Sequence, residues 1–94
     1  MPNGRPLRPD EAKAAIRNIL ENEDVRWTRH AVRELEKDDL ETPDALNVLR
    51  AGVVDPAEWE NGEWRYRVRT SRMVVVVAFV EGGMRIVTGW RIKR

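Results

Sequence analysis

The sequence contains no cysteine and only one histidine among its 94 residues. Without cysteine, disulfide bridges, thiolate metal ligands and thiolate nucleophiles are all excluded. A single imidazole would need carboxylates alone as further zinc ligands, so we expect no metal and no cofactor. No apolar run reaches the roughly 18 residues of a membrane span, and the N-terminus lacks the apolar core of a signal peptide. We therefore expect a cytoplasmic protein without a membrane segment.

The residues that are present suit one soluble domain. Hydrophobic residues make up 41% of the chain and charged residues 35%, a balance typical of globular proteins. Residues 1–8 carry two prolines and a glycine without any periodicity, which predicts a flexible lead-in. Residues 9–94 are predicted to form the single domain.

The net charge of +1 conceals an uneven distribution. Residues 1–60 hold 9 Lys and Arg against 14 Asp and Glu, a balance of −5, whereas residues 61–94 hold 8 against 2, a balance of +6. The basic half could attract phosphates. Alternatively, the two halves could compensate each other's charge within the fold.

The N-terminal half has the 3.6-residue periodicity of amphipathic helices. The first predicted helix begins at Pro9 and ends near residues 22–24. The second begins at Thr28, whose hydroxyl can cap the free N–H groups. The third is predicted to begin with Thr42 as its cap and to end at Gly52, where a left-handed residue is typical. The apolar stripe of the first helix consists of Ala12, Ala15, Ile16, Ile19 and Leu20.

After Gly52 the period falls to two, which predicts strands. Val53 and Val54 open an extended link that closes at the turn pair Asn61-Gly62. Residues 63–69 alternate, residues 73–80 are apolar on both faces as in a central strand, and residues 84–92 alternate again. The connections are short, so we expect antiparallel pairing. The predicted fold class is α+β, with two or three N-terminal helices packed on a three- to four-stranded antiparallel sheet.

The alternation of residues 63–69 places Arg65, Arg67 and Arg69 on one sheet face, about 7 Å apart along the strand. Tyr66, with Trp64 and Val68, takes the opposite face and should pack against the helices. The arginine row could bind phosphates, since a guanidinium donates two parallel hydrogen bonds, or it could be paired with acids such as Glu63 and Glu81. The candidate RNA-binding residues are Arg65, Arg69, Arg72, Arg85 and Lys93.

No glycine-rich phosphate loop, helix-turn-helix or zinc-finger spacing is present. Contact with an RNA backbone is therefore favoured over sequence-specific DNA binding. His30 lies in the first turn of the second predicted helix, where the helix dipole disfavours the imidazolium, and a neutral imidazole can act as a general base. The alternative for His30 is a polar residue on the helix surface without a catalytic role. Thr88 is either a functional hydroxyl that needs a hydrogen-bond partner if buried, or simply a β-branched residue that favours a strand.

Three segments, Thr28-Arg29-His30-Ala31, Tyr66-Arg67-Val68 and Val87-Thr88-Gly89-Trp90-Arg91, follow one another in a familiar order. Over residues 25–92 the chain resembles small bacterial domains related to the RelE and MqsR toxins, within the barnase–EndoU–colicin–RelE group of metal-independent RNases. The resemblance implies a toxin of a toxin–antitoxin system. Its partners would be RNA, an antitoxin encoded by the adjacent gene and, where translation is the target, the ribosome. The catalytic residues it implies are His30, Arg67 (or Arg65 in its place), Thr88, Arg91 and Tyr66.

The mechanism implied is transesterification by the ribose 2′-OH. His30 would accept the proton, Arg67 and Arg91 would stabilise the charged phosphorane, Thr88 would hold a phosphate oxygen, and Tyr66 or a second arginine would serve the leaving group. The alternative is a non-catalytic basic module that binds an acidic partner protein, RNA or the ribosome. In that case residues 73–80 could pair into an oligomeric sheet.

Overall fold

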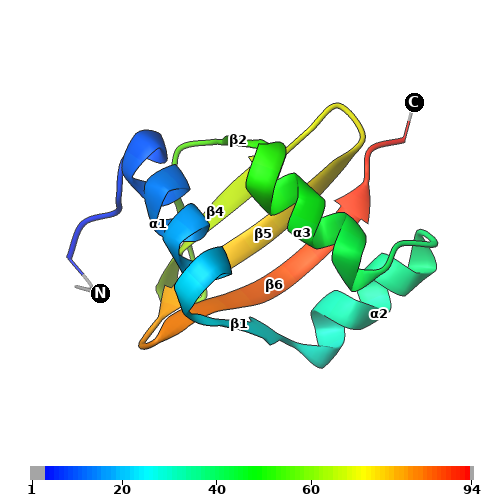
Figure 1. The fold of residues 1–94 in the computed structure, drawn as a ribbon, viewed down its shortest axis with the longest axis horizontal. Coiled ribbons are helices and arrows are strands. Elements are labelled where there is room, and N and C mark those ends of the chain that lie inside the picture. Colours follow the sequence, from blue (N-terminus) through cyan, green and yellow to red (C-terminus); the bar gives the residue numbers. More distant parts are fainter. Residues whose placement is uncertain (1–3, 94) are drawn as a thin grey trace.

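A computed structural model describes residues 4–93. The fold is α+β: helices cover one face of a six-stranded, mostly antiparallel sheet and leave the other face uncovered (Figure 1). The helices are α1 (Pro9–Asn22), α2 (Arg29–Lys37) and α3 (Thr42–Ala51). The strands are β1 (Asp24–Trp27), β2 (Val53–Val54), β3 (Glu58–Glu60), β4 (Glu63–Arg69), β5 (Met73–Val80) and β6 (Gly83–Arg91). The strand order is β1-β6-β5-β4-β2, and β3 pairs with β4 beside this path.

The helices begin close to where the sequence predicts. Pro9 is the first residue of α1, and the Thr28 hydroxyl accepts a hydrogen bond from the Ala31 N–H at 3.0 Å, which caps α2. The cap of α3 is Glu41 rather than Thr42, because Glu41 and Asp44 form a reciprocal capping box. Gly52 is not left-handed, since its φ is −77°. Glycine is required there for space instead: a Cβ would lie 2.6 Å from the Val48 carbonyl oxygen.

The sheet has more strands than the three or four predicted, and one pairing is parallel. β1 runs parallel to β6, with Arg26 opposite Arg85 and Trp27 opposite Ile86. This strand escapes prediction because four residues of mixed charge give too little alternation to recognise. β1 and β6 can be parallel because two helices and four strands separate them along the chain.

A β-bulge between the pairs at Val76 and Val77 changes the alternation of β6. Before the bulge, the Arg85 side chain lies on the uncovered face. After the bulge, Thr88 and Trp90 lie on this face, and Arg91 lies on the helix-covered face. Residues 85 and 91 would share a face in a regular strand. The extra residue therefore separates Arg85 from Arg91, which the sequence placed together.

The strand β5 is the centre of the sheet, as predicted. Hydrogen bonds to β4 and β6 occupy both of its edges, so no edge remains through which residues 73–80 could pair with a second copy. Beneath the helices the core includes the fully buried side chains of Ile16, Leu35, Leu49, Tyr66, Val68, Val75, Val77, Met84 and Ile86.

The predicted lead-in falls partly outside the described residues, which begin at Gly4. Within the described part, the Leu7 N–H donates a hydrogen bond to the Tyr66 hydroxyl at 2.8 Å. Leu7 also packs against the core, so this end of the segment is fixed to the domain. In the part of the chain that is described, no helix is long and apolar enough to cross a membrane.

Candidate functional site

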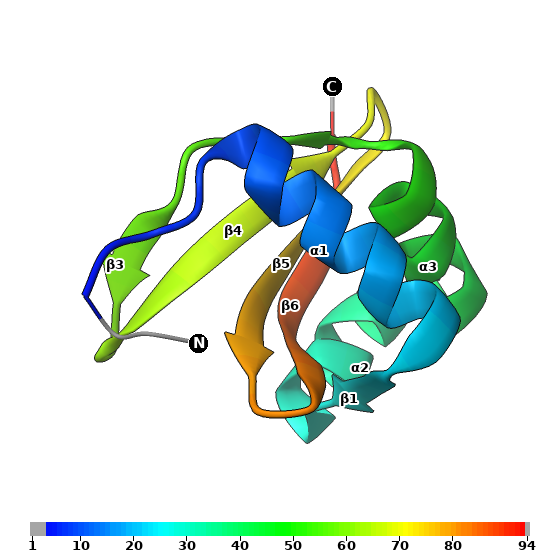
Figure 2. The same ribbon diagram turned by 60° about the vertical axis from the view of Figure 1, so that its left-hand side comes forward.

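The uncovered face of the sheet carries the arginine row that the alternation of residues 63–69 predicts. Figure 2 shows all three helices on the opposite side. Register arranges this face in rows across three strands. Arg67 lies opposite Val76, which lies opposite Thr88, and the next row joins Arg69 to Trp90 through Val74. The sheet thus brings Arg67, Thr88 and Trp90 into one strip.

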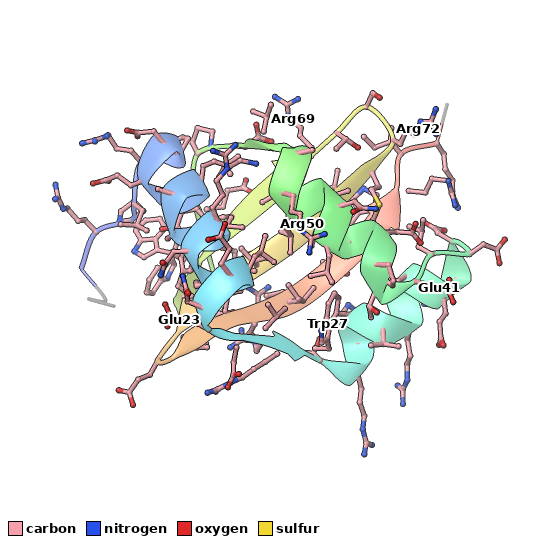
Figure 3. The ribbon with its side chains drawn as sticks, in the orientation of Figure 1. Glu23, Trp27, Glu41, Arg50, Arg69 and Arg72 are labelled. Carbon is pink, nitrogen blue, oxygen red and sulfur yellow. The ribbon has the colours of Figure 1, made fainter. Side chains whose placement is uncertain are left out.

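The arginine row of β4 is paired with acids along its whole length. Arg65 Nε lies 2.9 Å from a Glu63 oxygen, and Arg67 Nε lies 3.1 Å from Glu58. At the end nearest the β4–β5 turn, Arg69 Nε lies 3.0 Å from Asp55 (Figure 3). The compensation alternative therefore holds for this row. Most of the acids that pair with this row lie on β3 or just before it in the chain. The chain reverses direction at Asn61-Gly62, so β3 pairs with β4 and these acids lie beside the arginines.

Glu63 joins two strands through one carboxylate. Its Oε2 accepts hydrogen bonds from Arg65 of β4 and Arg85 of β6. Burial tends to raise the pKa of Glu63, but the hydrogen bonds and charges of the two guanidiniums hold this pKa below its ordinary value. The carboxylate is therefore ionised at neutral pH, and it fixes Arg65 and Arg85 away from any external anion.

Arg67 is the arginine of the β4 row whose side chain also contacts β6. Its Cζ lies 5.8 Å from the centre of the Trp90 ring, within the range of a cation–π interaction. Thr88 lies two residues before Trp90 on the same face, in the same row as Arg67, with Val76 between them. The Thr88 and Trp90 side chains are both partly exposed. Trp90 was not identified as a site residue, although the parity change at the bulge places it here.

His30 is exposed in the first turn of α2. The start of this helix is fixed against the bulge, since the Thr28 hydroxyl lies 3.0 Å from the Ile86 carbonyl oxygen and 3.4 Å from that of Val87. His30 follows Thr28 by two residues, and Thr88 follows Val87 by one. The start of α2 and the backbone at Val87 therefore adjoin, but α2 packs on the helix-covered face, whereas the Thr88 side chain lies on the uncovered face.

Tyr66 and Arg91, two further candidate catalytic residues, lie on the other face. Tyr66 is only 2% exposed and its hydroxyl accepts the Leu7 hydrogen bond. Arg91 donates from its guanidinium to the Asp38 carbonyl oxygen at 3.1 Å. The backbone N–H of Arg91 donates a hydrogen bond to the Asp38 carboxylate at 2.8 Å, and Lys93 Nζ lies 3.3 Å from the same carboxylate. These contacts attach the end of β6 to the turn between α2 and α3.

Arg72 lies apart from the strip, at the turn between β4 and β5 (Figure 3). Together with Arg91 it lines an open hollow of about 430 Å³ on the helix side. Leu40, Val48 and Met73 contribute apolar surface to this hollow. The sheet therefore divides the predicted residues between two places rather than gathering them in one.

No group of three or more metal-ligating side chains gathers anywhere in residues 4–93. Comparison of the chain with family models, with curated proteins and with solved structures gives no match. The function of the site is therefore argued from its own chemistry.

Proposed function

We propose that the protein is a metal-independent endoribonuclease that acts as the toxin of a toxin–antitoxin system. One observation supports this proposal most directly. The guanidinium of Arg67 lies over Trp90 on the face that also carries Thr88, and α2, with the only histidine, begins against the β6 backbone at Ile86. A base can accept the 2′-OH proton, a cation and a hydroxyl can stabilise the charged phosphate, and an aromatic ring can stack on a base of single-stranded RNA.

In the proposed reaction His30 accepts the proton of a ribose 2′-OH. The 2′-oxygen attacks the adjacent phosphorus, the P–O5′ bond breaks, and a 2′,3′-cyclic phosphate forms. The leaving 5′-oxygen takes a proton from water, and the hydroxide so formed takes the proton from His30. Arg67 stabilises the added negative charge on phosphorus, and Thr88 donates to a non-bridging oxygen.

The contacts of Tyr66 and Arg91 argue against catalytic roles for both residues. Tyr66 is buried beneath the helices, and the sheet separates it from Arg67. The Arg91 guanidinium binds the backbone of Asp38. The proposed catalytic set is therefore smaller than the one the resemblance implies. It consists of His30, Arg67 and Thr88.

The experiment is cleavage of RNA by the purified protein in the presence of EDTA. Products with 2′,3′-cyclic ends are expected. His30→Ala should slow cleavage by about 10²–10⁴-fold, the usual contribution of a general base. Glu36→Ala, an exposed change on the same helix, is the matched control and should cleave like the unaltered protein. Equal cleavage by His30→Ala would contradict the role of His30.

The proposed biological role has a separate test. Expression of the protein should arrest bacterial growth, and co-expression of the product of the adjacent gene should relieve the arrest. His30→Ala should not arrest growth. Arrest by this variant would separate the toxic effect from RNA cleavage.

A second candidate function is a non-catalytic module that binds a protein partner. The ion pairs of Arg65, Arg67 and Arg69 favour it, because a sheet face with alternating charges suits a protein surface better than a polyanion. Salt distinguishes the two functions, since RNA binding weakens steeply as salt concentration rises. Tight partner binding without RNA cleavage is the result expected of this module.

A further inference from the structure

The cations of β1 and α2 differ from those of the β4 row in their surroundings. Arg26, Arg29 and Arg33 are exposed, and no carboxylate within residues 4–93 forms an ion pair with any of them. The Arg26 guanidinium donates a hydrogen bond of 3.3 Å to the Glu81 carbonyl oxygen. Three positive charges therefore face solvent in a segment, residues 25–33, that contains no acid.

The three side chains follow one another along the β1–α2 edge: Arg26 extends to the Glu81 carbonyl oxygen at the β5–β6 turn, and Arg29 and Arg33 lie on α2. Arg29 and Arg33 are four residues apart on α2, so they share one face of the helix. Arg26 is the third residue before Arg29, and Trp27 between them marks where β1 passes into α2 (Figure 3). We call the exposed group of Arg26, Arg29 and Arg33 the β1–α2 patch.

The electrostatics of the β1–α2 patch are unfavourable within the protein alone. The N-terminus of a helix carries partial positive charge and is stabilised by acids. The first turns of α1 and α3 contain Asp10 with Glu11 and Asp44, respectively, whereas the first turn of α2 contains no acid. Arg29 stands there instead. Arg26 lies opposite a further cation, Arg85.

The acids nearest in sequence do not remove this excess of positive charge. Glu34 is bound by Lys37 at 2.7 Å, and Asp24 forms no ion pair with another described residue. A bound polyanion would supply the missing negative charge. Guanidiniums suit phosphates in particular, because their planar fork donates two parallel hydrogen bonds.

We propose that the β1–α2 patch is the surface that binds the RNA backbone, with His30 at its centre. This inference rests on the proposed function and adds the substrate-positioning residues to it. His30 lies between Arg29 and Arg33 in the sequence of α2, and the Thr28 hydroxyl that caps this helix lies 3.4 Å from the carbonyl oxygen of Val87, the residue before Thr88. Phosphates held by the patch would place the chain of a single-stranded RNA across the β1–α2 edge. The arginines of the β4 row are paired with acids, and of these arginines only Arg67 belongs to the proposed RNA site.

The test measures binding of a fluorescent 2′-O-methyl oligouridylate, an RNA that cannot undergo 2′-OH attack. The triple variant Arg26→Gln, Arg29→Gln, Arg33→Gln removes the patch. For single strands the slope of log K against log salt is about −0.7 per phosphate contact. The variant should therefore lower the magnitude of this slope by about 2 and weaken binding at least about tenfold near 50 mM salt.

The matched control removes three other exposed arginines that form no ion pair among the described residues. It carries Arg5→Gln, Arg17→Gln and Arg50→Gln, with the same change in net charge. Its slope should stay within about 0.7 of the unaltered protein, a loss of at most one contact. All six positions are exposed, and thermal unfolding of both variants verifies that the fold is retained.

Equal losses in the two triple variants would overturn the inference, because binding would then depend on net charge alone. If the unaltered protein cleaves RNA and the patch variant binds as before, the inference fails and the proposed function stands. If the unaltered protein neither binds nor cleaves RNA, both fail. Binding of polyglutamate as tightly as RNA, with the same loss in the patch variant, would assign the patch to an acidic protein and overturn the inference.

Discussion

Glu63 shows how a single residue changes the meaning of the arginine pattern. Its carboxylate binds one guanidinium on its own strand and another on β6, and its side chain is only 25% exposed. Alternation predicts which face a side chain takes, but not which charges meet there. The acid that neutralises Arg65 is two residues away in sequence. Arg85 comes close only through the order of the strands.

Replacing Glu63 tests the strength of this cluster. Glu63→Gln should lower the free energy of unfolding at neutral pH by about 1–2 kcal/mol, because two charge-assisted hydrogen bonds are weakened. The folded-state pKa of Glu63 is below its ordinary value. The stabilisation is therefore complete above the ordinary glutamate pKa and is lost as pH falls through the folded-state pKa.

Urea unfolding over a range of pH measures this effect. The difference in unfolding free energy between the two proteins should shrink on acidification, since a protonated glutamate resembles glutamine. Glu81→Gln is the control, because Glu81 is exposed and its carboxylate forms no ion pair within residues 4–93. Its effect should stay within about 0.5 kcal/mol. A pH-independent difference for Glu63→Gln would contradict the assignment.

Among the elements, β6 is the strand whose existence the sequence predicts but whose bulge it does not. The central strand β5, the β4 alternation and the turn at Asn61-Gly62 follow from local pattern, and all three are observed. The bulge in β6 does not, because an extra residue has no signature in apolar alternation. Regular alternation would put Arg85 and Arg91 on one face, and the bulge puts them on opposite faces. Thr88 and Trp90 were brought to the uncovered face by the same shift.

The edge strand β1 depends on a close approach that the sequence does not reveal. Gly83 lies opposite Asp24, and a Cβ on Gly83 would collide with the backbone carbonyl oxygen of Asp24. Glycine is therefore needed there for space. The placement of Arg26 and the start of α2 follow from this pairing, so the candidate site depends on a residue outside it.

Gly83→Ala should separate β1 from β6. We expect a loss of about 1–3 kcal/mol in the free energy of unfolding, the usual range for overpacking. Hydrogen exchange should show faster exchange of the β1 amides, while amides of β4 and β5 remain protected. Gly4→Ala provides the control, since a Cβ there meets nothing within 4 Å. Unchanged protection of β1 in Gly83→Ala would show that the backbone accommodates the methyl group.

At the scale of the whole molecule, the acidic part of the chain lies against the basic part in the fold. Residues 1–60 carry 9 − 14 = −5 and residues 61–94 carry 8 − 2 = +6. The pairings β1–β6, β2–β4 and β3–β4 each join one half to the other. The sequence shows the division clearly. Which acid faces which arginine follows only from the topology, because the partners are set by strand order and register.

Splitting the chain at the Asn61-Gly62 turn tests this arrangement. Both residues have positive φ, 49° and 78°, and both are exposed, so a break there removes little packing. The fragment of residues 1–60 contains the helices without the sheet that covers their apolar faces. It should be unfolded alone, because isolated helices of this length are marginal in water. Mixed with residues 61–94, it should regain helical circular dichroism.

The rate of this association should depend strongly on salt. Fragments of charge −5 and +6 attract each other over distances that salt screens, since the Debye length is about 10 Å at 0.1 M ionic strength. Stopped-flow measurements should therefore give an association rate that falls as salt is added. The fragment with Glu58→Gln and Glu60→Gln should associate more slowly at low salt and with a weaker salt dependence, because two of the acids that face β4 are neutral. Equal rates for the two fragments at every salt concentration would mean that apolar burial alone drives the halves together.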